Sequence, residues 1–167
     1  MPAIVAGDAH PANPAETIEF AVICVIRKNL NAAAARLFEA AFRNDPMLAA
    51  RPEGQRYNAA CAAALAGCGH GDDANLLNDE DRARWRHQAA AWLRADLTLL
   101  NEVAQKPDQR QQVAKTLAHW LKDSDFSGVR DPQLIATRPE AERRLWESLW
   151  ADVQQLLDDS QLPLKSN

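Results

Sequence analysis

The chain has 167 residues, of which 47% are hydrophobic and 25% charged, and its formal net charge is −4 at pH 7. This length suits one domain with a buried core, and the composition is ordinary for a soluble globular protein. The negative balance argues against a protein that binds nucleic acid through non-specific phosphate contacts. Alanine dominates the hydrophobic share and no segment alternates with a period of two, so we expect an all-α fold without a sheet.

Cysteine usage and the apolar runs predict where the protein resides. The three cysteines (Cys24, Cys61 and Cys68) are odd in number and form no Cys-x-x-Cys pair, which favours a reducing compartment. No basic region followed by an apolar stretch opens the chain, so no signal peptide is visible. The longest apolar run, 20–26, is too short to span a bilayer. We therefore expect a cytoplasmic protein without membrane or nucleic-acid partners.

The first half of the chain predicts three helices after a flexible N-terminal arm over 1–13. Pro14 suits the first turn of a helix that ends near Lys28. Asn31 is the expected N-cap of a second helix over 32–44. A third helix follows and is expected to end at Gly67.

The second half predicts three longer helical segments. Residues 68–77 form the longest expected flexible stretch, after which Asn78 or Asp79 caps a helix of about two dozen residues. Pro107 is expected to begin the next helix. The connector over 123–138 contains Asp131–Pro132, a cap followed by a first-turn proline, which predicts one short helical turn.

Pro139 is expected to begin the last helix, which has a wide apolar face. We thus expect one helical domain over 14–158, followed by a C-terminal tail over 159–167.

A spaced set of small and aromatic residues gives the strongest pattern in the chain. Ala34, Phe38, Ala41 and Pro46 follow one another at offsets of four, seven and twelve, and a second helix-forming block lies at 57–67. This spacing is typical of the second helix of a tetratricopeptide-type repeat. The sequence therefore predicts stacked antiparallel helix pairs of a degenerate tetratricopeptide-like kind, about six helices in all. Such stacks bury a shared core and leave a long surface for a partner.

Over residues 15–157, the stretches AAAARLFEAAFRNDPMLA, RYNAACAAALAGCGHGDDA, AAAWLRADL and HWLKDSDFSGVRDP carry a family likeness. They resemble the tetratricopeptide-like C-terminal region of bacterial serine/threonine protein kinases of the planctomycete type. In that family the region lies downstream of the kinase domain, so the resemblance implies a regulatory or scaffolding role. The alternative is an intramolecular role, in which the chain packs on a kinase domain and binds no outside partner.

The chain lacks the residues that would make it a kinase or a hydrolase. The tetrapeptide 125–128 is similar to the magnesium-binding Asp-Phe-Gly triplet, but a serine interrupts it. No His-Arg-Asp loop, glycine-rich loop or matching lysine accompanies it. No histidine is spaced to activate a cysteine or serine nucleophile. We therefore expect a non-catalytic protein with no cofactor and no metal.

The glycine-rich loop over 67–73 is a remote alternative site for a small molecule or nucleotide. It contains Gly67, Gly69 and Gly71 with His70, but it follows a helix, whereas phosphate loops follow a strand. A helix C-cap and a turn explain the glycines without a ligand.

Two groups of residues are the predicted binding surface for a protein or peptide partner. Asn58 occupies the position at which peptide-clamping tetratricopeptide domains hold a partner's main chain, and Arg56 lies beside it. The expected fourth helix carries a basic strip that would attract an acidic segment or an adjoining kinase domain. The side chains predicted to form this strip are Arg82, Arg86 and Arg94, with Trp85 expected to be partly exposed between Arg84 and Arg86.

Overall fold

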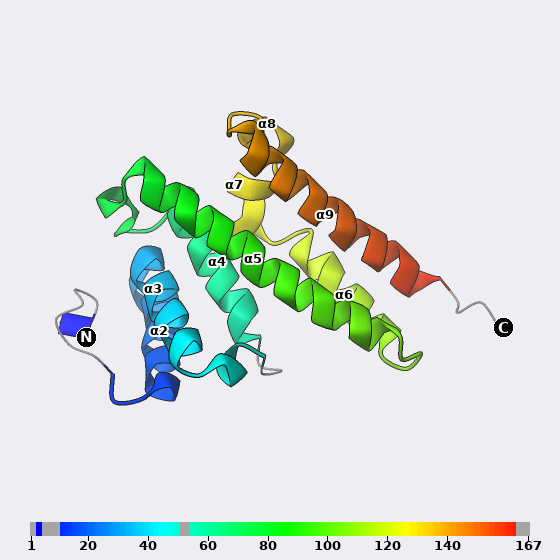
Figure 1. Ribbon diagram of the computed structural model, residues 1–167, viewed down its shortest axis with the longest axis horizontal. Helices are drawn as coiled ribbons and strands as arrows, with labels where there is room; N and C mark the ends of the chain where they lie inside the picture. The colour runs from blue at the N-terminus through cyan, green and yellow to red at the C-terminus, as the bar shows by residue number, and fades with distance from the viewer. Residues whose placement is uncertain (1–2, 5–10, 51–53, 163–167) are drawn as a thin grey trace. The chain divides into compact units, whose positions relative to one another are not determined.

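The computed structural model describes residues 3–4, 11–50 and 54–162, and among these residues it contains helices and no strand (Figure 1). The all-α fold expected from the composition is therefore confirmed. The elements in chain order are α2 (Pro14–Lys28), α3 (Asn31–Asn44), η1 (Pro46–Ala50), α4 (Gln55–Gly67), η2 (Ala74–Leu76), α5 (Asp79–Ala104), α6 (Arg110–Trp120), η3 (Ser124–Phe126), α7 (Ser127–Arg130), α8 (Pro132–Ile135) and α9 (Glu140–Gln161). None of the helices in the described ranges is both long and apolar enough to cross a bilayer.

The chain divides into two compact units, Met1–Leu93 and Arg94–Asn167, although the sequence predicted one domain over 14–158. The boundary falls within α5, so one continuous helix contributes its first half to unit 1 and its second half to unit 2. Most of the expected arm (1–2 and 5–10) and part of the expected tail (163–167) lie outside the described residues. The last helix continues to Gln161, past the predicted end.

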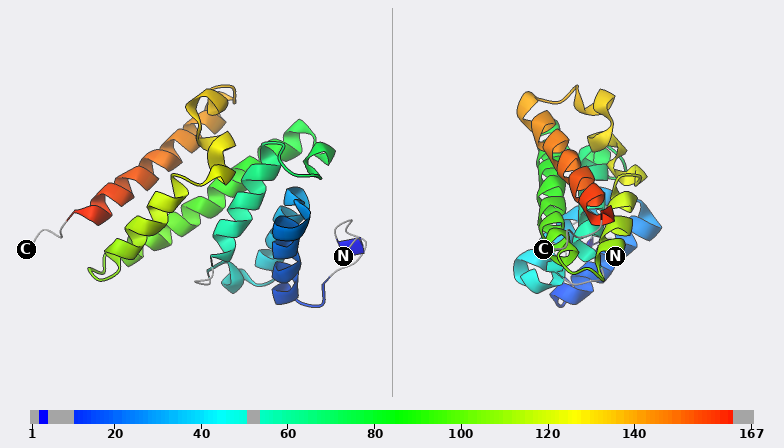
Figure 2. Two further views of the ribbon diagram at one scale, coloured as in Figure 1. Left: turned by 180° about the vertical axis from the view of Figure 1, so that it is seen from behind. Right: turned by 90° about the vertical axis from the view of Figure 1, so that its right-hand side faces the viewer.

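Unit 1 is built on close packing between helices that carry small side chains. Helix α3 packs against both α2 and α4, and consecutive helices reverse direction (Figures 1 and 2). Ala34, Phe38 and Ala41, the spaced set that predicted a helix pair, are all 0% exposed. Phe38 packs against Phe42, whose ring meets Trp92 of α5 edge-on at 5.8 Å. Because alanines line the contacts, the backbones approach closely and one aromatic cluster fills the remaining space.

The start of α3 is capped from a distant part of the chain. Asn31 was the predicted N-cap, but it is the first residue of the helix, and the N-cap residue Leu30 makes no side-chain bond. The carboxylate of Asp73 accepts hydrogen bonds from the backbone N–H groups of Ala32 and Ala33, at 3.1 and 2.8 Å. Asn31 turns its amide to the carbonyl of His70 instead, at 3.1 Å. Asp73 therefore provides the N-terminal capping bonds of α3 that the sequence predicted for Asn31.

The loop after α4 is tied to the turn between α2 and α3, although the sequence predicted a flexible stretch. The N–H of Asp72 donates to the carbonyl of Asn29 at 2.8 Å, and the Asn29 amide donates to the Asp72 carboxylate at 2.9 Å. Gly71 has φ +113°, and a Cβ there would lie 2.9 Å from the Asn31 amide nitrogen. A side chain at this position is therefore excluded both by backbone strain and by space.

Helices α4 and α5 approach closely at Gly67, which ends α4 as the sequence predicted. Gly67 itself is not left-handed; Gly69, two residues past the helix end, adopts a positive φ (+84°). A Cβ on Gly67 would lie 2.8 Å from the carbonyl oxygen of Arg82 and 2.9 Å from the backbone nitrogen of Arg86. The glycine is needed because the backbone of α5 occupies the space a side chain would take.

In unit 2, α6 packs against α9 (Figure 2). Large side chains fill the core of this unit. Trp146 is fully buried, and its ring stacks near that of Trp150 with centroids 6.2 Å apart. The indole N–H of Trp150 donates to the carbonyl of Val129 at 2.8 Å, which ties α9 to α7. The short turn predicted at Asp131–Pro132 is confirmed as α8, with the Asp131 carboxylate accepting from the N–H of Gln133. Helix α6 begins at Arg110, three residues later than Pro107.

Candidate functional site

The predicted basic strip on α5 does not form a single exposed surface. Arg86 is only 5% exposed, and its guanidinium donates to the carbonyl of Gly67 at 2.6 Å. Arg82 donates to the carbonyl of Ala74 at 3.2 Å. Both cations are therefore bound to carbonyl oxygens at the C-terminal end of α4 and in the loop that follows, where positive charge also complements the helix dipole.

Trp85 is 6% exposed, so the expectation that it is partly exposed is wrong. Arg84 lies on the opposite side of α5 from Arg82 and Arg86, because residues two apart on a helix are about 200° apart. Its guanidinium lies 4.2 Å from the Trp85 ring centroid and bonds the Glu39 carboxylate at 2.8 Å. The tryptophan that was expected to contact a partner instead contributes to the packing of unit 1.

Arg94 belongs to unit 2, where it bonds two side chains of α9. Its guanidinium donates to the carboxylate of Asp152 and, at 2.8 Å, to the hydroxyl of Ser148. Both pairs are partly exposed, and exposed ion pairs contribute little to stability. Their effect here is to hold the charge of Arg94 against α9.

Two of the six predicted contact residues lie in the first turn of α4, and one of them is exposed. Asn58 is exposed, and its backbone N–H donates to the carbonyl of Gly54 at 3.0 Å. Arg56 is half-buried and makes interactions within the chain. Asn58 is therefore the predicted contact residue whose position best agrees with partner binding.

Side chains of the glycine loop over 67–73 make hydrogen bonds within unit 1. Its carboxylates at Asp72 and Asp73 bond Asn29 and the start of α3. The free N–H groups at a helix N-terminus are where a phosphate binds most readily. Asp73 already fills that position at α3, so the loop serves as an internal cap.

The sequence reasoning missed an exposed apolar pair on α2. Ile23 is 38% exposed and Ile26 is 71% exposed, three residues further along the helix. The side chains that α2 buries are Thr17, Ile18, Ala21 and Cys24, on the face towards α3. The signal was present, because the run over 20–26 is apolar all round, whereas a helix with one buried face needs only one apolar stripe.

The environment of Cys24 does not activate it as a nucleophile. None of the three cysteines forms a disulfide, and Cys24 and Cys61 are buried. Burial raises the pKa of the Cys24 thiol, and the neighbouring Asp73 carboxylate raises it further, because both disfavour the thiolate. A raised pKa is the opposite of what a catalytic thiol requires.

No protein-family model, curated protein or solved structure matches the chain. The likeness to the tetratricopeptide-like region of bacterial kinases therefore stays a prediction from the sequence.

Proposed function

We propose that this chain is a non-catalytic protein-binding module made of stacked, tetratricopeptide-like helix pairs. On this proposal it serves a regulatory or scaffolding role beside a serine/threonine protein kinase in the cytoplasm. The observation that carries it is the exposed pair Ile23 and Ile26 on α2. Two large aliphatic side chains on the outer face of a short helix favour contact with another protein surface.

The arrangement of unit 1 supports this surface. In stacked helix pairs the first helix of each pair lines one side of the stack. On this proposal α2 and α4 are the first helices of successive pairs. Helix α3 follows α2 and precedes α4 in the chain, and it packs against both. Asn58 on α4 would add a polar contact to the apolar contact made by α2.

The partner that fits this surface is a protein segment with an apolar face, such as one side of an amphipathic helix. An acidic partner has less support than it had from the sequence, because Arg82 and Arg86 are bonded to carbonyl oxygens within unit 1. Apolar contact also predicts that binding changes little with salt, since only exposed charges are screened.

Site-specific photo-crosslinking in cells of the source organism tests the proposal. A photoreactive phenylalanine analogue at Ile26 should give discrete crosslinked products whose partner peptides mass spectrometry identifies. Adding Ile23→Glu should remove them, because a carboxylate in an apolar contact is costly to desolvate. The matched control is the same analogue at Leu134 of unit 2, which is 47% exposed.

Identical products from both positions, or none from Ile26, would contradict the proposal. A crosslink to a kinase domain within the same polypeptide would support the intramolecular alternative instead.

A further inference from the structure

The exposed face of α2 carries opposite charges on either side of its isoleucines. Glu19 lies four residues before Ile23, and Arg27 lies four residues after it. Because successive helix residues are about 100° apart, these three side chains and that of Ile26 lie within one arc of about 100°. This arc lies opposite the face that α2 buries against α3. The helix therefore presents an acid, an apolar centre and a base in one line.

Both charges at the ends of this line are available to a partner. Glu19 and Arg27 are exposed, and neither forms an ion pair or a side-chain hydrogen bond within the part of the chain that the structure describes. Elsewhere in unit 1, by contrast, Arg43 and Arg84 both pair with the Glu39 carboxylate. The line of α2 is complementary to a copy of itself that runs in the opposite direction, because reversal exchanges the acid and the base.

We propose that this face is a dimer interface, at which α2 pairs antiparallel with α2 of a second copy of the chain, a partner assignment that rests on the function proposed above. A two-fold axis beside Ile23 sets residues at equal distances on either side of the axis opposite each other. Glu19 then faces Arg27 of the second copy twice, each pair about 6 Å along the helix from the axis. The two Ile23 side chains meet at the centre, with the Ile26 side chains beside them.

The order of the charges selects the antiparallel arrangement. In a parallel pair, Glu19 would face Glu19 and Arg27 would face Arg27, and such like-charge contacts are unfavourable. Antiparallel helices also place opposite ends of their dipoles side by side. Contacts through one helix face are weak, because stable complexes bury about 800 Å² per partner, so the dimer should form only at high concentration.

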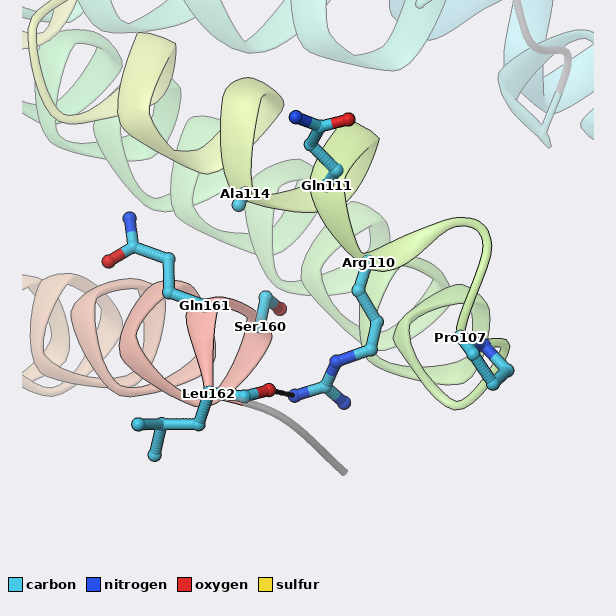
Figure 3. A pocket seen from close by; sticks show the side chains of 7 residues that line it. All are labelled: Pro107, Arg110, Gln111, Ala114, Ser160, Gln161 and Leu162. Carbon is cyan, nitrogen blue, oxygen red and sulfur yellow. Dashed lines mark hydrogen bonds between the residues drawn. The ribbon is translucent and has the colours of Figure 1, made fainter. Parts of the chain in front are cut away.

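Leu162 in unit 2 supplies the matched control, because it is an exposed aliphatic residue outside α2. It is 61% exposed and is the C-cap residue of α9. Figure 3 shows its side chain directed away from Arg110, while its carbonyl accepts a hydrogen bond from the Arg110 guanidinium at 3.0 Å. This bond uses the backbone of Leu162, so Leu162→Glu should leave both the fold and the self-association unchanged.

Sedimentation velocity of the purified full chain tests the proposal. We expect a monomer–dimer equilibrium over concentrations up to about 1 mM, a range in which weak contacts become populated. Ile23→Glu should remove the dimer, because two carboxylates would meet at the apolar centre. The Leu162→Glu control should dimerise as the native chain does.

Charge reversal tests the antiparallel pairing itself. Glu19→Arg or Arg27→Glu alone puts like charges opposite each other at both ends, and should raise the dissociation constant at least about fivefold. The double variant, Glu19→Arg with Arg27→Glu, restores opposite charges and should recover the native affinity. It carries the folding costs of both substitutions, so its recovery cannot come from a change in helix stability. Circular dichroism melts of dilute samples check that each variant is folded.

A chain that stays monomeric at every concentration, or a double variant as weak as the single ones, would overturn the proposal. If the photoreactive analogue at Ile26 then crosslinked a different protein in cells, the function proposed above would still stand without the dimer. If it gave no product either, both would fail.

Discussion

The two units fill their interiors in different ways. Unit 1 buries alanines at its helix contacts, with Ala34, Ala41 and Ala60 all 0% exposed, and it packs one aromatic cluster beside them. Unit 2 buries large side chains, with Trp146, Leu149 and Val153 at 0%. Small residues let backbones approach, whereas large residues fill the space between more distant helices. Unit 1 should therefore be sensitive to added volume and unit 2 to removed volume.

The largest effect is expected for Trp146→Ala in unit 2. Removing a fully buried indole leaves a cavity and should lower the free energy of unfolding by about 3–5 kcal/mol. Urea unfolding followed by the NMR signals of unit 2 measures it, with Trp146→Phe as the smaller, volume-retaining change. A loss below about 1 kcal/mol would mean that the core of unit 2 collapses to fill the gap.

Ala60→Leu tests the opposite sensitivity in unit 1. Ala60 is 0% exposed on α4, so a larger side chain should cost about 1–3 kcal/mol through overpacking. Ala91→Leu, at an exposed position of α5, is the control and should change stability little. If both substitutions shift the thermal midpoint equally, small residues are not what unit 1 requires.

Arg86→Ala should destabilise unit 1 by about 1–3 kcal/mol, because the Gly67 carbonyl loses its 2.6 Å hydrogen bond in a buried place. An arginine on an exposed strip would instead give almost no change on substitution. Arg43→Ala is the comparison, since Arg43 is 71% exposed and pairs with Glu39 at 3.4 Å. Thermal unfolding should leave the Arg43 variant near the native midpoint.

Asp73→Ala removes the distant cap of α3 and should cost about 1 kcal/mol. Asp72→Ala removes an exposed bond to Asn29 and should cost less. Circular dichroism melts of both variants rank the two contacts. A larger loss for Asp72 would show that the loop is held mainly by its exposed bonds.

The rate at which Cys24 is chemically modified should measure how readily α2 opens from α3, and this test needs no substitution. The raised pKa of Cys24 lowers the thiolate fraction at any given pH, and burial limits access, so iodoacetamide at pH 8 should modify half-buried Cys68 first. Mass spectrometry of timed samples resolves the two sites. Equal rates would show that α2 opens readily from α3.

Local signals in the sequence predicted most of the helix boundaries. Pro14, Asn78 and Asp131 are found at the helix starts that their chemistry favours. The spaced set around Phe38 predicted the core of the α2–α3 pair because helical period and side-chain size together define a packing face. Such signals lie within one turn of the residue they describe.

One missed feature, the cap of α3, depends on residues far apart in the chain, whereas the burial of Arg86 does not. Nothing near the start of α3 indicates that Asp73, forty residues after Ala33, caps this helix. Burial of Arg86 had a local signal, because Ala89 and Leu93 continue its face of α5 at offsets of three and seven. The charge of Arg86 suggested an exposed side chain. An arginine can nevertheless be buried where a carbonyl oxygen accepts its hydrogen bond.

The contacts of Asn29, Asn31 and Asp73 also determine how unit 1 opens. They join the end of α2, the start of α3 and the loop after α4, which would otherwise fray independently. Native-state hydrogen exchange should therefore give these three segments one common opening free energy, as expected for a single cooperative unit. The far end of unit 1, where η1 follows α3, has no such contact with Asp73, and its amides should exchange faster and separately.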